Sequence, residues 1–219
     1  MNLDPDQRRA VEHLGGPLLV LAGPGTGKTG VLISRVAHLV EERKVEPRRI
    51  LALTFSRRAA EEMQSRILAR SPEAADVEVR TFHSFALRLV RRHHRRLGFE
   101  RPPDILPTAR QWATIKDLLK DEDPIEWDLA PNAFDRSATV REVYDLMLRA
   151  QEHLKGPKEL REFGERHDRP YLSRAGDLLE RYRHRLREDS EVDYERVVQL
   201  AIELLRSLAL AGSRESGVG

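Results

Sequence analysis

A glycine-rich stretch near the start of the chain has the residue types and spacing that hold nucleotide phosphates. Its residues, in order, are Ala22, Gly23, Pro24, Gly25, Thr26, Gly27, Lys28 and Thr29. Glycines let a loop curl so that successive backbone N–H groups point inward at phosphate oxygens. In such loops the lysine reaches the β- and γ-phosphates and the following hydroxyl binds Mg²⁺, so Lys28 and Thr29 are the expected catalytic pair. The stretch predicts a binding site for a nucleoside triphosphate with Mg²⁺.

The segments on either side of this loop determine how it is presented. Residues 17–21 are apolar and predict a buried strand, and residues 31–40 are amphipathic and predict a helix. The helix would add its unpaired N–H groups and the positive end of its dipole to the phosphate site. Ala22 stands where the strict pattern has glycine, whereas Gly27, Lys28 and Thr29 match it. The alternative is an ordinary glycine-rich turn between a strand and a helix.

The first hundred residues alternate between strand and helix patterns. A capped helix is expected over residues 4–14, because Asp4 can cap it and Gln7 completes a capping box. Further strands are expected at 49–55 and 77–80, each followed by a helix. This order predicts an open parallel sheet covered by helices, an α/β fold. Ligands bind at the carboxyl ends of such strands, where the phosphate loop, Thr54-Phe55 and Thr81-Phe82-His83 all fall.

The pattern changes after Pro103, and helices dominate the rest of the chain. They are expected at 108–120, 137–153, 157–167, 170–188 and 192–210. Asp121-Glu122 follows the first of these and is interpreted as a solvated helix end. The small, polar residues 211–219 are expected to be a disordered tail.

Composition narrows the class of protein. The 219 residues include no cysteine and no run of 18 apolar residues, and the acidic N-terminus lacks a hydrophobic signal core. A cytoplasmic protein is the simple expectation. The net charge is only +2, but seven arginines and one acid lie between residues 80 and 101. This arginine stripe predicts either a phosphate-backbone contact or a solvated helix face.

Four stretches in a fixed order resemble the superfamily 1 DNA helicases of the UvrD/Rep/PcrA type. They are Leu3–Val11, which resembles the Q motif, Ala22–Thr29 (Walker A, with the family's alanine), Ile50–Met63 (motif Ia) and Arg80–Phe85 (the next DNA-contacting motif). The helical stretch from Ile105 resembles the inserted domain 1B, and residues 192–194 resemble the return to domain 1A. The resemblance covers residues 2–210.

The resemblance implies a RecA-like P-loop NTPase fold with an inserted all-helical subdomain. Its parts would be residues 1–106 (domain 1A), 107–190 (domain 1B) and 191–210 (the return helix). It also implies an ATP-dependent 3′-to-5′ DNA helicase with ATP and Mg²⁺ as cofactors, in which Gln7 reads the adenine edge. Single-stranded DNA would contact Thr54, Phe55, Arg57, Thr81 and His83, because exposed aromatic rings stack on bases. From position alone, both phenylalanines could instead be core residues, and His83 could be a capping or core histidine.

Two features depart from the family pattern. Gly30 stands where an arginine often packs on the adenine. The Walker B strand ending in Asp-Glu is missing, and so are the arginines of the second motor domain. We therefore expect this polypeptide alone not to hydrolyse ATP at a helicase rate, and to need a C-terminal motor domain or a partner subunit. The alternative is a non-catalytic nucleotide- or DNA-binding fragment, or a degenerate subunit of a helicase–nuclease complex. A small-molecule kinase would need an acceptor site, and none is visible.

Overall fold

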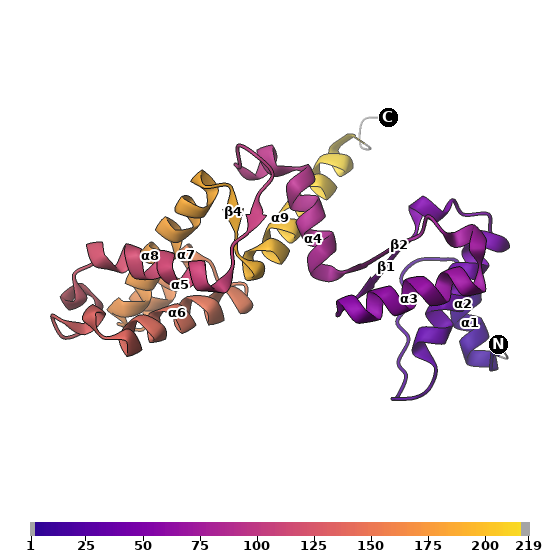
Figure 1. Cartoon of the computed structure of the whole chain (residues 1–219), viewed down its shortest axis with the longest axis horizontal. Helices are drawn as coiled ribbons and strands as arrows, with labels where there is room; N and C mark the ends of the chain where they lie inside the picture. Colours follow the sequence, from indigo (N-terminus) through magenta and orange to yellow (C-terminus); the bar gives the residue numbers. More distant parts are fainter. Residues whose placement is uncertain (1–2, 216–219) are drawn as a thin grey trace. The chain divides into compact units, whose positions relative to one another are not determined.

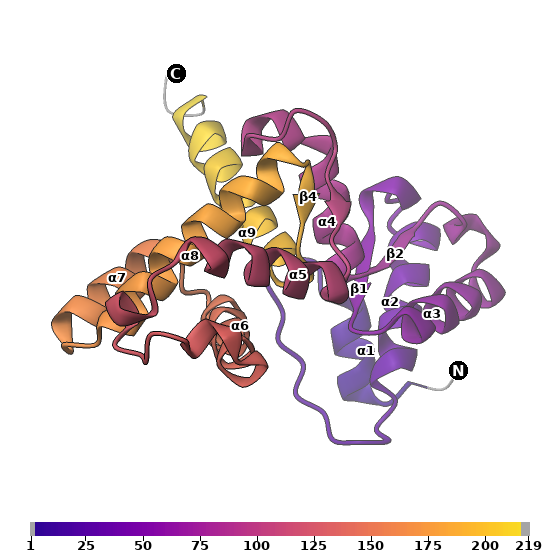
Figure 2. The same ribbon diagram turned by 60° about the vertical axis from the view of Figure 1, so that its left-hand side comes forward.

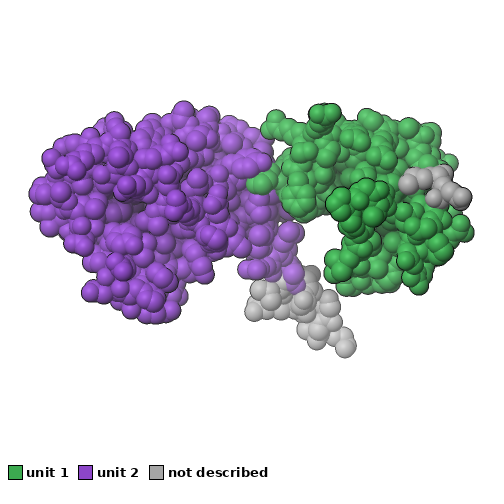
Figure 3. Space-filling view, turned by 90° about the horizontal axis from the view of Figure 1, so that it is seen from below, with its two compact units in different colours: residues 1–85 green, residues 86–219 purple. Residues whose placement is uncertain are grey.

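The chain divides into two compact units, residues 1–85 and 86–219 (Figure 3). The structure, a computed structural model, describes residues 3–215, with side chains through residue 209. The division falls ahead of the boundary expected at residue 106. Figure 1 labels the elements of both units.

Unit 1 contains helices on a small parallel sheet. Its elements are α1 (Pro5–Glu12), α2 (Lys28–Glu41), η1 (Pro47–Arg49), β1 (Leu51–Thr54), α3 (Arg57–Arg70), η2 (Pro72–Ala74), β2 (Glu78–Thr81) and the start of α4 (Phe82–Arg92). Strands β1 and β2 pair in parallel, with Leu51 opposite Glu78 and Thr54 opposite Thr81. The core lies where α2 and α3 pack together against the strands, with Ile33, Met63 and Ile67 buried. Two of the three predicted strands are therefore present, in the predicted β-α-β order with helices over the sheet.

The capping box predicted at the start of α1 is present. The Asp4 carboxylate accepts a hydrogen bond from the backbone N–H of Gln7 at 2.8 Å, and Gln7 Oε1 accepts one from the backbone N–H of Asp4 at 3.2 Å. Two otherwise orphaned N–H groups are thereby satisfied. The box places the rest of the Gln7 side chain at the N-terminal end of α1.

The strand predicted at residues 17–21 does not form. These residues belong to a long connection between α1 and α2 (Figure 2), and Leu19 and Leu21 are 82% and 86% exposed. A strand requires a neighbour to pair its N–H and C=O groups. Within residues 3–215, β1 and β2 pair with each other and no strand pairs with this segment. An apolar run can show that a segment suits a strand, but not that a partner strand is beside it.

Unit 2 is mainly helical. Its elements are the rest of α4, η3 (His94–Leu97), β3 (Asp104–Ile105), α5 (Thr108–Leu118), η4 (Leu119–Asp121), η5 (Pro124–Trp127), η6 (Ala133–Asp135), α6 (Ser137–Glu152), α7 (Pro157–Arg166), α8 (Pro170–Glu188), β4 (Glu191–Val192) and α9 (Tyr194–Glu215). A core beneath α5, α6 and α8 buries Trp127, Leu178 and Tyr182. The two-residue strands β3 and β4 pair in parallel. The helical segments predicted between residues 108 and 188 are present, each within a few residues of its expected bounds.

Two expectations in unit 2 need correction. The carboxylate of Glu122 is not a solvated helix end, because it accepts a hydrogen bond from Trp127 Nε1 at 2.8 Å and pairs with Arg181. Helix α9 continues to Glu215, so residues 211–215 are helical rather than part of a tail. Residues 216–219 of that expected tail lie outside the described part of the chain. No helix between residues 3 and 215 is long and apolar enough to cross a membrane.

Candidate functional site

The phosphate loop leads directly into α2. Lys28 is the first residue of the helix, and Gly27 precedes it in the left-handed region with φ of 82°. Gly25 is also left-handed, with φ of 74°. A side chain at either position would be strained, so these two glycines are the ones that this curl requires. The exposed Thr29 follows Lys28 in the first turn, where the helix N–H groups have no intrahelical acceptor.

Polar contacts fold the loop onto itself. The Lys28 ammonium donates hydrogen bonds to the carbonyl oxygens of Ala22 at 3.0 Å and Gly23 at 2.5 Å. The Thr26 hydroxyl also donates to the Gly23 oxygen, at 2.8 Å. The lysine therefore lies over the loop, with its charge beside the positive end of the α2 dipole. Anions are favoured at such a place by both charge and backbone donors.

Gln7 joins the loop from a different helix. Its Nε2 donates a hydrogen bond to the Thr26 carbonyl at 3.1 Å, and it approaches Gly27 so closely that a Cβ there would lie 3.5 Å away. Gln7 and the loop line one cavity of about 510 Å³. Apolar side chains of Ala10 and Val31 also line it. The structure thus brings the predicted adenine-reading residue beside the predicted phosphate-binding residues.

Arg35 holds the two helices of this site together, and the sequence reasoning missed it. Its Nη1 lies within hydrogen-bonding distance of the carbonyl oxygens of Ala10, Val11 and His13, at 2.9, 3.1 and 2.7 Å. These carbonyls form the C-terminal end of α1, where a cation is favoured by the helix dipole. Arg35 therefore fixes α1, which carries Gln7, to α2, which carries Lys28. The one available signal was an arginine on the otherwise apolar side of α2.

The ends of β1 and β2 carry the residues expected to contact DNA. Thr54 and Thr81 are opposite each other in the ladder, and Phe55 and Phe82 follow them. The two rings lie 5.1 Å apart between centroids, tilted by 42°. Phe55 is 90% exposed and Phe82 is 43% exposed. Phe55 is therefore not a core residue, which removes the alternative that its position had left open.

The remaining predicted DNA residues have different surroundings. Thr81 is buried and its hydroxyl accepts a hydrogen bond from the backbone N–H of Ser84 at 3.1 Å, at the start of α4. Arg57 is exposed in the first turn of α3, just after Ser56, which caps that helix. His83 is half-buried, and burial lowers its pKa below the ordinary value of 6.5. Thr81 therefore positions α4 through its side chain, whereas the guanidinium group of Arg57 is exposed to solvent.

The loop, the helix behind it and the parallel strands are typical of P-loop nucleotide-binding proteins. The model of the UvrD/REP helicase N-terminal domain family matches residues 3–216, and the chain belongs to this family. Belonging to it implies the P-loop NTPase fold for unit 1.

Similar proteins include ATP-dependent DNA helicases named PcrA. The chain is 35% identical to that of Bacillus subtilis (strain 168) and 34% identical to that of Leuconostoc citreum, each over 203 residues that cover 92% of this chain and 26% of the relative. It is 44% identical over 122 residues to a PcrA of Staphylococcus epidermidis, covering 55% of this chain and 17% of that protein. The chain thus spans about a quarter of the length of the first two relatives. At family level, ATP-dependent DNA helicase activity is supported.

Proposed function

We propose that this chain binds ATP and Mg²⁺ at the phosphate loop and single-stranded DNA at the ends of β1 and β2. It would act in the cytoplasm as the N-terminal part of an ATP-dependent 3′-to-5′ DNA helicase. The observation that carries the proposal of nucleotide binding is the hydrogen bond from Gln7, on α1, to the loop that leads into Lys28 and Thr29. Backbone N–H groups and Lys28 would hold the phosphates, Thr29 would bind Mg²⁺, and Gln7 would read the base. ATP supplies the bond whose hydrolysis drives a motor.

Nucleotide binding is tested by titrating a fluorescent ATP analogue into the purified chain with Mg²⁺. Replacing Lys28 by alanine removes charge-assisted hydrogen bonds to the phosphates, so affinity should fall by about 10-fold or more. Arg66→Ala is the matched control, because it removes an exposed cation on α3 of the same unit. Equal affinity for the Lys28→Ala and unmodified chains would contradict the assignment.

The DNA-binding part of the proposal is supported by the exposed Phe55 ring, which packs at a tilt against Phe82. Stacking on one aromatic ring contributes about 1–3 kcal/mol per base, so Phe55→Ala should weaken binding of a single-stranded oligonucleotide by about 5- to 150-fold. Fluorescence anisotropy at fixed salt measures this. Phe163→Ala, at a half-exposed phenylalanine of unit 2, is the control and should leave affinity unchanged. A Phe55→Ala chain with unaltered affinity would contradict the DNA site.

Hydrolysis is expected to need residues beyond Lys28, Thr29 and Gln7. We propose that a C-terminal motor domain or a partner subunit supplies the carboxylates that position Mg²⁺ and the attacking water. One observation favours this: Glu122, of the adjacent pair Asp121-Glu122, is held by Trp127 and Arg181 within unit 2. The purified chain should therefore bind ATP without DNA-stimulated turnover. Robust turnover that Lys28→Ala abolishes would contradict this, whereas binding without turnover also fits a non-catalytic subunit of a helicase–nuclease complex.

A further inference from the structure

Unit 2 contains a second cationic site of its own. A cavity of about 390 Å³ opens where α8, β4 and α9 meet η3, and four of the residues that line it are arginines: Arg96, Arg183, Arg187 and Arg196. All of them lie in the same compact unit, and none belongs to the phosphate loop. Where guanidinium groups around a cavity are buried, they need carboxylate partners or a bound anion.

The carboxylates around this cavity already have other partners. Glu180 pairs with Arg161 at 2.7 Å, and Glu191 pairs with Arg110 at 2.6 Å. Glu203 forms a two-pronged pair with Arg196, at 2.7 and 3.1 Å. The buried Asp193 accepts hydrogen bonds from the Arg196 backbone N–H at 2.7 Å and from Gln151 Nε2 at 3.5 Å. Of the four arginines, Arg196 is therefore the one that pairs with a carboxylate among the described side chains.

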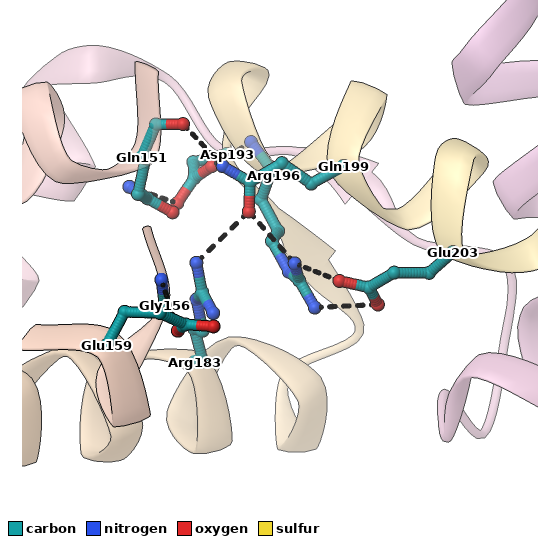
Figure 4. A network of polar contacts seen from close by, with 8 residues as sticks. All are labelled: Gln151, Gly156, Glu159, Arg183, Asp193, Arg196, Gln199 and Glu203. Atoms are coloured by element: carbon teal, nitrogen blue, oxygen red, sulfur yellow. Dashed lines mark hydrogen bonds and ion pairs between the residues drawn. The ribbon is translucent and has the colours of Figure 1, made fainter. Parts of the chain in front are cut away.

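Arg183, on α8, donates instead to a neutral group. Its Nη2 donates a hydrogen bond to Gln199 Oε1 at 3.2 Å, and Arg196 Nη1 donates to the same oxygen at 2.9 Å (Figure 4). The Gln199 amide is fixed in this orientation because its Nε2 donates to the Gln151 carbonyl. Two guanidinium groups thus converge on one amide oxygen. Burial, and then repulsion from Arg196, lower the pKa of Arg183 to about 10.

One donor at this site has no acceptor. The Nε of Arg183 is buried and makes no hydrogen bond with any described residue. A buried N–H without a partner costs about 1–3 kcal/mol, more when the group is charged. It is thus an unsatisfied, charged donor on a side chain that lines the cavity, although the Nε atom itself is closed to solvent.

Two further arginines lie toward solvent. Arg187 is one helical turn beyond Arg183 on α8, and its Cδ lies 4.0 Å from where a Cβ of Gly98 would be, which places its stem beside the end of η3. Arg96 lies on η3 itself. Both are exposed, and neither forms an ion pair with a carboxylate in the described part of the chain. Together with Arg183 they leave the site with an excess of positive charge.

We propose that this cavity binds a phosphate group, with Arg187 and Arg96 as donors at the mouth and with a rotation of the Arg183 side chain that brings its unsatisfied Nε–H to the phosphate. Guanidinium groups suit the task, because their planar forks match phosphate oxygens and stay charged. The phosphate can be free inorganic phosphate or a phosphodiester of a nucleic acid strand, and both offer the same oxygens. The proposal does not depend on the nucleotide site of unit 1.

The test uses the full chain carrying Lys28→Ala, which weakens phosphate binding at the loop. Sodium phosphate is titrated against sodium chloride at equal ionic strength while NMR follows the arginine Nε–H resonances. The Arg183 resonance, assigned by its disappearance in Arg183→Lys, should shift saturably with phosphate and not with chloride. Arg187→Ala and Arg96→Ala should each weaken phosphate binding by about 3- to 10-fold, since each removes a charged donor.

The control is Arg185→Ala, which removes an exposed arginine of the same helix that pairs with Asp189. It should leave phosphate affinity unchanged. The absence of a saturable shift, or an equal loss in Arg185→Ala and Arg187→Ala, would overturn the proposal. Since Arg96 and Arg187 are exposed, their variants keep the test valid even where Arg183→Lys fails to fold.

A second arm distinguishes the two sources of phosphate. A single-stranded oligonucleotide is titrated in place of inorganic phosphate. If the source is a phosphodiester, the oligonucleotide shifts the same Arg183 resonance. Arg187→Ala then reduces the slope of log affinity against log salt concentration by about one. A shift with inorganic phosphate alone assigns the site to free phosphate. A site that responds to neither probe does not exist as proposed.

Discussion

Replacing Arg35 by methionine should loosen α1 and with it the contact between Gln7 and the phosphate loop. Arg35 Nη1 faces three carbonyl oxygens at the end of α1, but a guanidinium nitrogen of this kind carries two N–H groups, so two full hydrogen bonds are the most it can donate. Each charged hydrogen bond is worth about 1.5 kcal/mol at the low end. Water can replace part of this at a half-buried site, which leaves about 2 kcal/mol.

Amide hydrogen exchange of α1 measures this loss directly. Both tryptophans, Trp112 and Trp127, lie in unit 2, so their fluorescence does not report on α1. A loss of about 2 kcal/mol corresponds to about 30-fold less protection of the α1 amides. Arg66→Met, at an exposed arginine of α3, is the matched control and should change this protection little.

Nucleotide binding then separates positioning from general destabilisation. If Arg35 acts by placing Gln7, Arg35→Met and Gln7→Ala should each weaken ATP binding, and the double variant should be little worse than either single one. Inorganic triphosphate has no base, so its affinity should fall less than that of ATP in all three. Unchanged α1 protection in Arg35→Met, or an equal loss of ATP and triphosphate binding, would refute the reasoning.

Two further predictions concern stability. Gly176→Ala should destabilise unit 2 by about 1–3 kcal/mol. The new Cβ would lie 2.7 Å from the Pro157 carbonyl oxygen and 3.0 Å from Arg161 Cγ, and this crowding outweighs the better helix propensity of alanine. Urea unfolding followed by tryptophan fluorescence measures the loss, and Gly15→Ala, where nothing lies within 4 Å of the new Cβ, is the control. Unit 1 should lose stability as the pH falls below about 6.5, because the folded-state pKa of His83 is lowered, so the unfolded chain takes up a proton first. An NMR titration should place the pKa of His83 below 6.5, and His83→Gln should remove its contribution to this pH dependence; a pKa at or above 6.5 would contradict the sign.

Local chemistry was readable from the sequence wherever neighbours along the chain determine it. The capping box of Asp4 and Gln7, the left-handed glycines of the loop and the helices of unit 2 depend on residues a few positions apart. The contacts that assemble the site are not local. Gln7 meets Thr26 across 19 positions, and Arg35 reaches back 22 to 25 positions to α1. No pattern of residue types predicts such pairs from one sequence.

The predictions that differed from the structure share one physical cause. Apolar residues at 17–21 suit a buried strand, and a carboxylate after a helix suits a solvated end, but burial depends on which partner lies nearby. Leu19 and Leu21 are exposed because no strand of residues 3–215 pairs with them, whereas Glu122 is held because Trp127 and Arg181 lie close to it. Phe55 shows the same dependence, since its exposure follows from its place beyond the end of β1.

Because residues 17–21 form no strand, the polar contacts of the phosphate loop determine its position. Where a strand precedes a phosphate loop, ladder hydrogen bonds fix the point at which the loop begins. Here the start of the loop is held instead by Lys28 donating to Ala22 and Gly23, and its end by Gln7 donating to Thr26. Two of these three contacts use Lys28, the residue expected to bind phosphate, so a nucleotide that attracts Lys28 also competes with them. Gln7 is then the contact that remains. Because Arg35 holds the helix that carries Gln7, the affinity of this site for ATP should depend on a residue that contacts the opposite end of α1 from Gln7.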